Sequence, residues 1–295
     1  MTLDLPGWLD AVRGGVASAG AEAGAFAHQV SIRALTTSTN DDVTRAAATG
    51  APEGYTVIAA EQSAGRGRRG ASWHSPSAQG LYLSTLLRPD RWAALRADAA
   101  SPVASLVTLM AGVVVARAIG EVCAAPVELK WPNDVMVRTS SPGAPWRKLA
   151  GILAEGTSDG GVLRSVVLGV GLNLTPSAAP AEVAARMISL DQLLPGAAAA
   201  GPETLTALVR ALLVRLREGT ALLARGAADE VREQWRRCAP SVEGTVVRWR
   251  DQAGEHEGHA AGIDDGGALR VRRPDGGVVT VHGGDVEWRM GHRDA

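Results

Sequence analysis

Alternating and continuous apolar stretches mark the strands in the first third of the chain. Residues 29–35 alternate polar and apolar side chains, as a half-buried strand does. Residues 56–60 and 81–87 are apolar runs, which predict two further strands. Between the first two, Thr39 followed three residues later by Asp42 predicts a helix that opens with a capping box. We therefore expect strands and helices to be mixed in this part.

The longest uncharged stretch, residues 99–116, poses a choice between a core helix and a membrane span. It only just reaches the minimum length of a span, and it contains serine, threonine and proline. Ser101 as the N-cap and Pro102 at the first helical position are typical of a helix start. We predict a buried helix over residues 101–120 and no membrane segment.

Two further strands and a hairpin are predicted after this helix. The strands are expected at residues 127–131 and 135–137. A loop rich in serine, proline and glycine follows at residues 138–146. Residues 149–155 and 162–174 then predict a hairpin, because an Asp-Gly-Gly turn joins two apolar runs.

The last third of the chain changes character near Pro240. Before it, leucine and valine at helical spacing predict a helix over residues 203–225, and a second helix is expected over residues 229–237. Beyond it, short strands alternate with turns rich in aspartate and glycine, which indicates a small β-barrel. The predicted strands are residues 245–249, 258–263, 268–272, 278–282 and 286–288.

These elements divide the chain into three parts and predict an α+β fold with a mixed sheet. Residues 1–28 form a short, weakly patterned leader with room for one helix. That leader is too short for the three packed helices of a helix-turn-helix domain, so no DNA partner is expected. Residues 29–239 form the main domain, and residues 240–295 form the barrel.

Composition narrows the classes of protein. The 295 residues are 46% hydrophobic, which suffices for one large core and a small one. There are 30 basic and 31 acidic residues, so no net field attracts nucleic acid or an anionic membrane. Cys123 and Cys238 lack a CxxC spacing, and the histidines lack a metal-ligand spacing. With no signal-peptide pattern, a cytoplasmic location is expected.

Residues 65–70, which we call the arginine loop, carry the first candidate chemistry. Gly65 and Gly67 allow the backbone to approach a ligand closely. Arg66 and Arg68 offer planar donor forks to a phosphate or a carboxylate. A mobile surface loop or a nucleic-acid contact explains this motif equally well when it is taken alone. It is not a P-loop, because no Gly-Lys-Ser/Thr follows.

Two other turns place polar groups beside apolar strands. Asn133 and Asp134 follow Trp131-Pro132, where side chains can converge on a ligand, although the same sequence is typical of an ordinary turn. Lys148 precedes an apolar strand and can offset the charge of a phosphate, or it is a surface lysine at a strand edge. Lys130 fits a site or a solvated strand face equally well.

Trp73 and a pair of glycines complete the candidates. Trp73 can cover an apolar ligand or a purine, although a tryptophan that only anchors its loop is the more common case. Gly169 and Gly171 lie within a predicted strand. Such glycines indicate a β-bulge by default, or a backbone on which a flat ligand can lie.

Assembled in this order, the motifs resemble the biotin–protein ligase family. One motif would be weak, but several in the family's order and spacing make the match specific. The resemblance covers about residues 32–174, and the C-terminal β segment also fits. The matching stretches are residues 37–40, Glu61-Gln62, 65–70, Trp73, 81–84, 130–134, 148–151 and 169–173.

The resemblance implies a fold and a reaction. The fold is a mixed-sheet catalytic domain of the biotin/lipoate ligase type, followed by a small SH3-like β-barrel. Biotin and ATP react, with Mg²⁺, to give biotinyl-5′-AMP and pyrophosphate. A lysine of a biotin carboxyl carrier domain then attacks the mixed anhydride and releases AMP. The chain is expected to be of the ligase-only type and a monomer or weak homodimer, and the metal ligands are unknown.

The resemblance also implies roles at the biotin end of the site. Ser38, Thr39 and Gln62 would hydrogen-bond the ureido ring of biotin, which is polar and needs partners when buried. Trp73 would wall the biotin or adenine pocket. Further ligand-binding positions implied by the match are Asn40, Gly65, Gly67, Gly151, Gly169, Gly171 and Asn173.

Catalytic roles follow by the same correspondence. Arg66 and Arg68 would bind the carboxylate and the phosphate and order the loop over the adenylate. Lys148 would stabilise both anions during transfer, because a carboxylate attacking a phosphate brings like charges together. Asn133 would position the acyl phosphate. Asp134 would orient or deprotonate the incoming lysine.

Two other functions remain open on the sequence alone. A lipoyl or octanoyl attachment enzyme would share the catalytic fold, and the arginine loop favours biotin over it. A nucleic-acid-binding module would use Arg66, Arg68 and Arg69. The near-zero net charge and the lack of an interleaved basic and aromatic stripe argue against that module.

Overall fold

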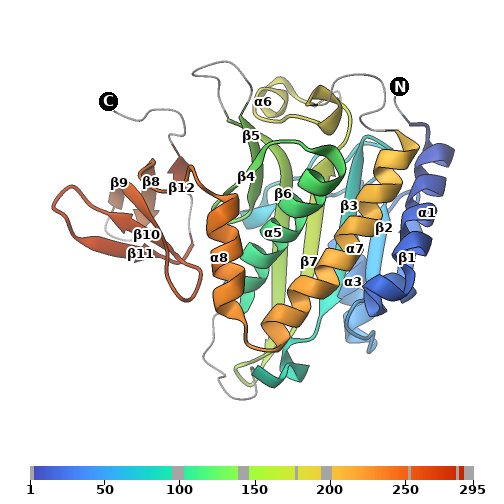
Figure 1. Ribbon diagram of the computed structural model, residues 1–295, viewed down its shortest axis with the longest axis horizontal. Coiled ribbons are helices and arrows are strands. Elements are labelled where there is room, and N and C mark those ends of the chain that lie inside the picture. Colours follow the sequence, from blue (N-terminus) through green and yellow to red (C-terminus); the bar gives the residue numbers. More distant parts are fainter. Residues whose placement is uncertain are drawn as a thin grey trace.

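The computed structural model of the chain describes residues 3–94, 103–138, 146–176, 179–193, 201–251, 254–283 and 286–288. Two sheets organise them. A seven-stranded mixed sheet has the order β1-β2-β3-β7-β6-β5-β4, and a five-stranded sheet has the order β11-β10-β9-β8-β12. Figure 1 shows the large sheet at the centre and the small one at the left, beside α8.

The strands of the large sheet follow the predicted strands closely. β1 pairs with β2 in parallel, and the remaining neighbours pair antiparallel. The central strands are nearly continuous apolar runs because both faces of the sheet are covered. The strands are β1 (Val30–Arg33), β2 (Thr56–Ala59), β3 (Gly80–Leu87), β4 (Val127–Lys130), β5 (Asp134–Arg138), β6 (Trp146–Asp159) and β7 (Val162–Asn173).

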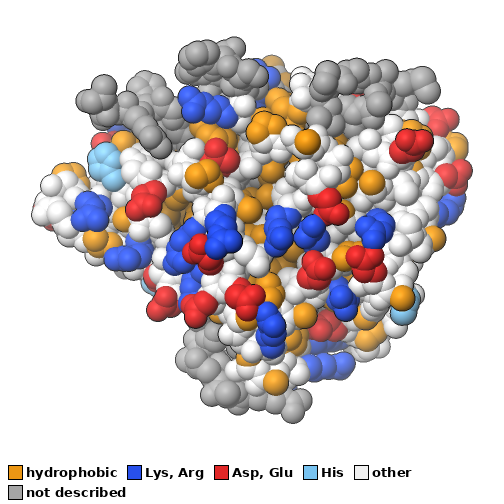
Figure 2. Space-filling model, in the orientation of Figure 1, with side chains coloured by type: hydrophobic (Ala, Val, Ile, Leu, Met, Phe, Trp, Pro, Cys, Tyr) orange, Lys and Arg blue, Asp and Glu red, His pale blue; other side chains and the backbone are white. Residues whose placement is uncertain are grey.

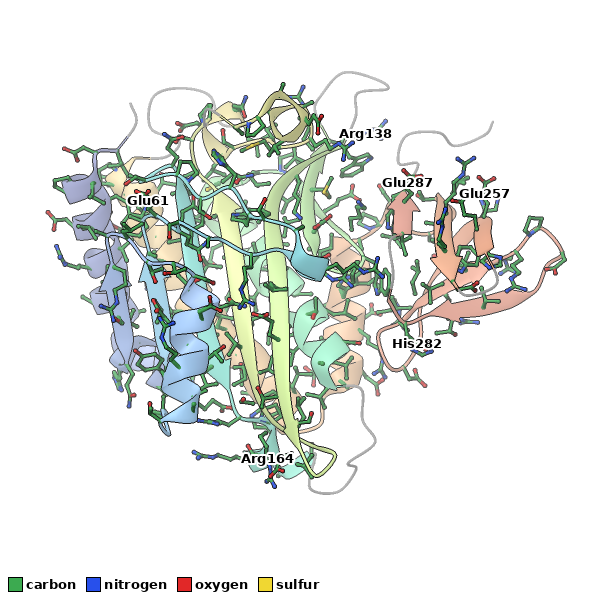
Figure 3. All side chains as sticks on the ribbon, turned by 180° about the vertical axis from the view of Figure 1, so that it is seen from behind. Glu61, Arg138, Arg164, Glu257, His282 and Glu287 are labelled. Carbon is green, nitrogen blue, oxygen red and sulfur yellow. The ribbon has the colours of Figure 1, made fainter. Side chains whose placement is uncertain are left out.

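Helices cover both faces of this sheet. Four long helices lie on the face that is in front in Figure 1, and α3 (Thr39–Ala48) packs on the other face against β2, β3 and β7, which is in front in Figure 3. The four are α1 (Leu5–Ala23), α5 (Val103–Cys123), α7 (Pro202–Ala224) and α8 (Ala228–Cys238). Two short helices are α2 (Ala25–His28) and α6 (Ala181–Ala184).

α5 is the buried helix that the apolar stretch predicts. It is described from Val103 onward, so the predicted cap at Ser101 and Pro102 lies outside the described residues. Among the described helices it alone is long and apolar enough to cross a membrane, yet most of its length is buried inside the protein. It packs against β6, α7 and α8, so it serves as the core helix of the main domain.

The N-terminal segment, expected as a weakly patterned leader, contributes to the core. α1 packs along α7, and its Trp8 is fully buried. The Trp8 indole donates a hydrogen bond to the carbonyl of Gly80 in β3 (3.1 Å). Gly15 of α1 leaves room for α7, because a Cβ there would lie 2.6 Å from Cβ of Val209. The boundaries of the three predicted parts stay a prediction.

All five predicted C-terminal strands are present and form an antiparallel sheet that is consistent with a small SH3-like domain. The domain docks on the main one through the turn at residues 264–267. Trp131 donates from its indole to the carbonyl of Gly267 (2.9 Å), and Arg232 donates to the carbonyl of Asp265 (2.7 Å). The strands are β8 (Val246–Asp251), β9 (Gly254–Ile263), β10 (Leu269–Arg272), β11 (Val278–Val281) and β12 (Val286–Trp288).

The predicted capping box is wrong. α3 begins at Thr39 with Ser38 as its N-cap, and the Ser38 side chain makes no capping hydrogen bond. The backbone N–H and the hydroxyl of Thr39 instead donate to Oε1 of Gln62, at 2.9 and 3.1 Å. Asp42 accepts a hydrogen bond from Thr36 (2.7 Å). The local signal failed because contacts distant in the sequence use the same polar atoms.

Charges of both signs are interspersed over the helical face, as the near-zero net charge suggests (Figure 2). Arg215 of α7 forms ion pairs with Glu121 and Glu218 on this face. Arg117 of α5 donates to Gln234 of α8 (3.1 Å). Such exposed pairs contribute little to stability, so the core holds the helices on the sheet.

Candidate active site

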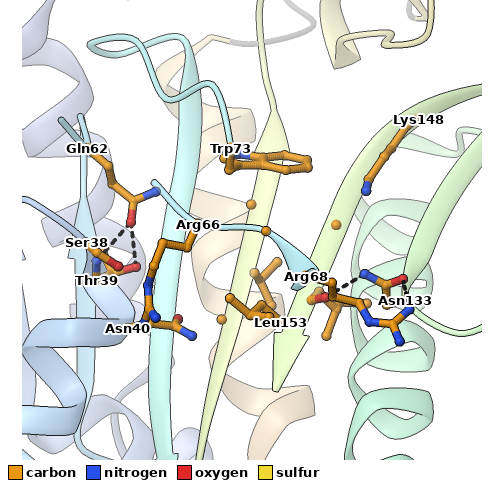
Figure 4. Close-up of a pocket in the computed structure, with 16 residues that line it drawn as sticks. Ser38, Thr39, Asn40, Gln62, Arg66, Arg68, Trp73, Asn133, Lys148 and Leu153 are labelled. Atoms are coloured by element: carbon orange, nitrogen blue, oxygen red, sulfur yellow. Dashed lines mark hydrogen bonds between the residues drawn. The ribbon is translucent and has the colours of Figure 1, made fainter. Parts of the chain in front are cut away.

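A pocket lies between the start of α3, the arginine loop and strands β6 and β7 (Figure 4). It encloses about 50 Å³ in this conformation. Most of the predicted site residues line it, with Gly65, Asp134 and Asn173 as the exceptions. The lining residues are Ser38, Thr39, Asn40, Gln62, Arg66, Gly67, Arg68, Trp73, Asn133, Lys148, Gly151, Ile152, Leu153, Gly169, Val170 and Gly171.

The arginine loop forms the first half and the tip of a short hairpin that folds over the pocket. Trp73 N–H donates to the carbonyl of Gly65 (2.8 Å), and Gly67 N–H donates to the carbonyl of Ala71 (2.7 Å). At the base, the Gln62 amide donates to the hydroxyl of Ser75 (2.9 Å). The backbone therefore presents Arg66 and Arg68 toward the sheet.

The two arginines diverge within the pocket (Figure 4). The Arg66 guanidinium reaches toward Asn40, where its Nη2 lies 2.7 Å from Asp41 Oδ1 and 2.8 Å from Glu155 Oε2. Arg68 points the other way and donates to Asn133 Oδ1 (3.3 Å). The sequence predicts one role for both residues, but they lie at opposite ends of the site.

A chain of hydrogen bonds forms the wall at the Arg66 end. The Asn40 amide donates to Glu155 Oε2 (2.6 Å) and accepts from the Ser84 hydroxyl (2.6 Å). The hydroxyls of Ser84 and Thr39 lie 2.7 Å apart, and Thr39 donates to Gln62. Ser84 is fully buried, and Thr39 and Asn40 nearly so. Apart from the Glu155 carboxylate behind it, this wall offers neutral hydrogen-bonding groups held in fixed orientations.

Trp73 lies on a pair of glycines. Gly151 and Gly171 face each other across β6 and β7 in regular register. A Cβ at Gly171 would lie 2.5 Å from the Trp73 indole nitrogen, and one at Gly151 would lie 2.8 Å from its ring. The default expectation of a bulge at Gly169 and Gly171 is therefore wrong. At Gly169 a Cβ would lie 2.3 Å from Asn40 Oδ1, so both glycines admit a close side chain.

Cations gather at the other end of the pocket. The Lys148 ammonium lies 2.5 Å from Asp134 Oδ1 and 5.1 Å from the ring centre of Trp73, within cation–π distance. Lys130 lies 3.7 Å from the other oxygen of Asp134. Asn133 donates to the carbonyl of Ile152 (2.8 Å), which holds its oxygen toward Arg68. This end suits an anion, and Asp134 lies just behind it.

A larger cavity of about 630 Å³ adjoins the pocket, and Gln62, Trp73 and Lys148 line both. Gly65 and Asn173, two predicted ligand-binding residues, line this second cavity. The Asn173 amide donates to the backbone carbonyls of Lys148 (3.3 Å) and Ile188 (3.2 Å), so it also ties β7 to its surroundings. Trp73 and Lys148 therefore lie at the boundary between the pocket and this second cavity.

Comparison with known proteins places the chain. Residues 33–173 match the biotin/lipoate A/B protein ligase family, and residues 244–289 match the biotin protein ligase C-terminal domain. The chain is 34% identical to a biotin–[acetyl-CoA-carboxylase] ligase of Mycobacterium tuberculosis over 269 residues, which is 90% of each protein. The chain belongs to the biotin protein ligase family. It is therefore a ligase enzyme.

Two other relatives are matched over smaller shares of their length. A Paracoccus denitrificans biotin–[acetyl-CoA-carboxylase] ligase is 34% identical, over 76% of this chain and 86% of the relative. The Bacillus subtilis bifunctional ligase/repressor BirA is 31% identical, over 80% of this chain and 67% of the relative. The biotin protein ligase of Aquifex aeolicus, solved with biotin and ATP, shares the fold with a TM-score of 0.69 at 22% identity, over 89% of this chain and 99% of that one.

Three polar residues that hold lining residues of the ligase pocket were not among the predicted site residues. Asp41 and Glu155 hold Arg66, and Ser84 joins Thr39 to Asn40. The sequence carried a signal for two of them. Ser84 lies within the mostly apolar run of residues 81–87, and Glu155 follows the apolar run of residues 149–154. A buried hydroxyl on a central strand requires a partner, which marks such a position as a site candidate.

Burial raises the pKa of groups around the ligase core. The Tyr82 hydroxyl donates to the carbonyl of Pro76 (3.2 Å), and burial, followed by the charge of Glu61, raises the pKa of this phenol far above its usual value. Burial raises the pKa of the Cys123 thiol to about 11. Both side chains are therefore neutral at physiological pH and act as packing groups.

Proposed function

We propose that this enzyme is an ATP-dependent biotin–protein ligase that forms biotinyl-5′-AMP and transfers biotin to a lysine of a biotin carboxyl carrier domain. The names of its 34%-identical relatives support biotin as the group transferred and acetyl-CoA carboxylase as the bearer of that domain. The match of residues 244–289 to the biotin protein ligase C-terminal domain favours biotin over lipoate within the shared family.

The polarity gradient along the pocket carries this proposal. Ser38, Thr39 and Gln62 form a neutral polar end, which suits the donors and acceptors of a buried ureido ring. Lys148 and Arg68 form a cationic end, which suits the carboxylate. Biotin is a ligand with these two ends, joined by an apolar chain.

Adenylation would take place at the cationic end. A biotin carboxylate oxygen attacks the α-phosphorus of ATP, the bond to the β-phosphate oxygen breaks, and pyrophosphate leaves. Both reactants are anions, so the cations of Lys148 and Arg68 would offset their repulsion and the charge that develops in the transition state. Asn133, which lies beside Arg68, would position the acyl phosphate.

Nucleotide binding is best accommodated in the second cavity. It has room for an adenosine, and it meets the pocket at Trp73 and Lys148. The indole face of Trp73 offers a surface on which a base can stack. In this arrangement Gly65 and Asn173 would contact the nucleotide, and the α-phosphate would lie near Lys148.

Transfer would follow with Asp134 as the partner of the incoming amine. The lysine amine of the carrier domain attacks the acyl carbon, AMP leaves, and the amine loses a proton. A protonated lysine is not a nucleophile, so a carboxylate at this point raises the rate. Asp134 forms ion pairs with Lys130 and Lys148 at the cationic end, which supports a role in orienting the incoming ammonium and accepting its proton.

Magnesium, which the family resemblance implies, has no protein-built cage in the described part of the chain. No group of three His, Cys, Asp or Glu side chains comes together there. Mg²⁺ usually binds through substrate phosphates and water with few protein ligands. We therefore expect it to enter with ATP, where it would neutralise charge on the phosphates.

Pyrophosphate release tests the proposal. The purified enzyme is mixed with ATP, Mg²⁺ and either biotin or lipoate, and a biotin carboxyl carrier domain is added in a second series. We expect release with biotin and a biotinylated carrier lysine by mass spectrometry. Release with lipoate alone would replace biotin by lipoate in the assignment, and release with neither would refute an acyl-adenylating function.

A further inference from the structure

The side chain of Arg66 crosses the pocket and ends on two carboxylates of the sheet and α3. Its Nη2 lies 2.7 Å from Asp41 of α3 and 2.8 Å from Glu155 of β6. The residues of the Arg66–Glu155 pair are 89 positions apart in the chain. The two ion pairs therefore tie the arginine loop to two separate elements.

We propose that Glu155, together with Asp41, is a positioning residue that anchors Arg66 and so holds the arginine loop closed over the pocket. The pocket encloses only about 50 Å³ in this conformation, and Arg66 is part of its lining. Because Arg66 belongs to the lining, movement of the arginine loop would change access to the pocket. The Arg66 anchor would then limit that movement.

Glu155 also connects the anchor to the neutral wall of the pocket. Its Oε2 accepts hydrogen bonds from both Arg66 (2.8 Å) and Asn40 (2.6 Å). Asn40 in turn accepts from Ser84, whose hydroxyl lies next to that of Thr39. Closing the loop thus completes the hydrogen-bonded wall, because one carboxylate oxygen serves both.

This placement separates the roles of the two arginines. Arg68 lies beside Asn133 at the cationic end, which suits contact with the anion. Arg66 is engaged by two carboxylates at the opposite end, so its charge is already balanced by the protein. Only the expected effect of the anchor on turnover depends on the proposed function, because the contacts of Arg66 form without ligand.

Hydrogen exchange of the ligand-free enzyme tests the anchor directly. Glu155→Gln removes the charge while its amide oxygen can still accept from Asn40. Because these ion pairs are partly exposed, we expect amides of residues 65–72 to exchange roughly 2- to 5-fold faster, with the rest of the sheet unchanged. Glu155→Asp, which keeps the carboxylate, should restore part of the protection.

Asp159→Asn is the matched control. Asp159 lies on the same strand and pairs with Arg164 (3.5 Å) at the far end of the β6–β7 hairpin (Figure 3 labels Arg164). It should leave exchange of residues 65–72 unchanged. In an Arg66→Gln background, Glu155→Gln should add nothing, because the anchor is already lost.

Several results would overturn the proposal. One is that amides of residues 65–72 exchange at the wild-type rate in Glu155→Gln. Another is that Glu155→Gln accelerates their exchange as much in the Arg66→Gln background as in the wild type. A third is faster exchange over the whole sheet, which would indicate a structural role. With biotin and ATP, Glu155→Gln should also increase labelling of an unrelated protein's lysines as adenylate escapes. An enzyme that releases no pyrophosphate with biotin would refute the proposed function and leave the loop-exchange result standing.

Discussion

The polar residues of the pocket fall into two groups with different surroundings. The group around Thr39, Asn40 and Ser84 is buried, and its members hydrogen-bond one another. The group around Lys148 and Asp134 is partly exposed and carries charge. A buried neutral network gives geometric selectivity, whereas accessible charges can meet charged substrates and a protein partner. Single substitutions should therefore separate binding from chemistry.

Replacing Lys148 by alanine should lower adenylation far more than stability. The cation is 30% exposed, so its pair with Asp134 contributes little to folding. Its loss should slow biotin-dependent pyrophosphate release by about 10²–10³-fold, the usual cost of removing one group that stabilises transition-state charge. Lys130→Ala, which removes the more distant partner of Asp134, should cost much less. Normal pyrophosphate release with a lowered melting temperature would make Lys148 structural.

Replacing Gly171 by alanine should displace Trp73. The added Cβ would lie 2.5 Å from the indole nitrogen, so the ring must move off the sheet. We expect a loss of about 1–3 kcal/mol in the free energy of unfolding and weaker biotin binding by calorimetry. Gly120→Ala is the control, since its Cβ meets nothing within 4 Å and alanine favours the helix. Unchanged binding in Gly171→Ala would show that Trp73 does not shape the pocket.

At the scale of elements, α1 covers part of the large sheet near the edge formed by β1 and β2. β1 and β2 lie at one edge of the large sheet, and α1 reaches the core by packing on α7 and sending Trp8 to β3. The four glycines of this 19-residue helix lower its intrinsic stability. It forms because tertiary packing holds it, which the sequence pattern underestimates.

Trp8→Ala tests this packing. The side chain is fully buried and its indole nitrogen is hydrogen-bonded, so the change should cost about 3–5 kcal/mol in the free energy of unfolding, measured with urea. Arg13→Ala on the exposed face of the same helix should stay within about 0.5 kcal/mol of wild type. A cost for Trp8→Ala no larger than that of the control would show that α1 is a detachable leader.

At the scale of the whole molecule, the C-terminal domain is docked beside the cationic end of the pocket. Trp131, two residues before Asn133, donates to the carbonyl of Gly267 in the turn between β9 and β10. Gly267 has a φ of +79°, and a Cβ there would lie 2.8 Å from Leu109 of α5. The contact thus links the small domain to the segment that presents Asn133 and Asp134.

Gly267→Ala should loosen this docking. Gly276→Ala is a matched control, because its φ of +86° imposes the same backbone strain in open space. Gly267→Ala should cost roughly 1–3 kcal/mol more than the control, through the clash with α5. It should also slow pyrophosphate release, if the turn positions Asn133. Equal melting temperatures for the two variants would show that the turn does not clamp the domains.

The sequence by itself determined the elements and the family. Periodicity located the strands of both sheets and three of the four long helices, α5, α7 and α8, because side-chain burial on one or both faces leaves a pattern in the chain. The ordered motifs identified the ligase family, and most predicted site residues line one pocket. Predictions of oligomeric state, location and absence of a DNA partner stay predictions.

Only the tertiary structure decided which polar groups meet. Nothing local shows that Glu155 holds Arg66, that Ser84 joins Thr39 to Asn40, or that Trp73 lies on Gly151 and Gly171. These partners come from different elements, so their contacts depend on strand order and register. The predictions of a capping box and of a bulge were wrong for that reason. Each prediction used only neighbouring residues, whereas side chains distant in the sequence bond the same polar atoms and fill the same space.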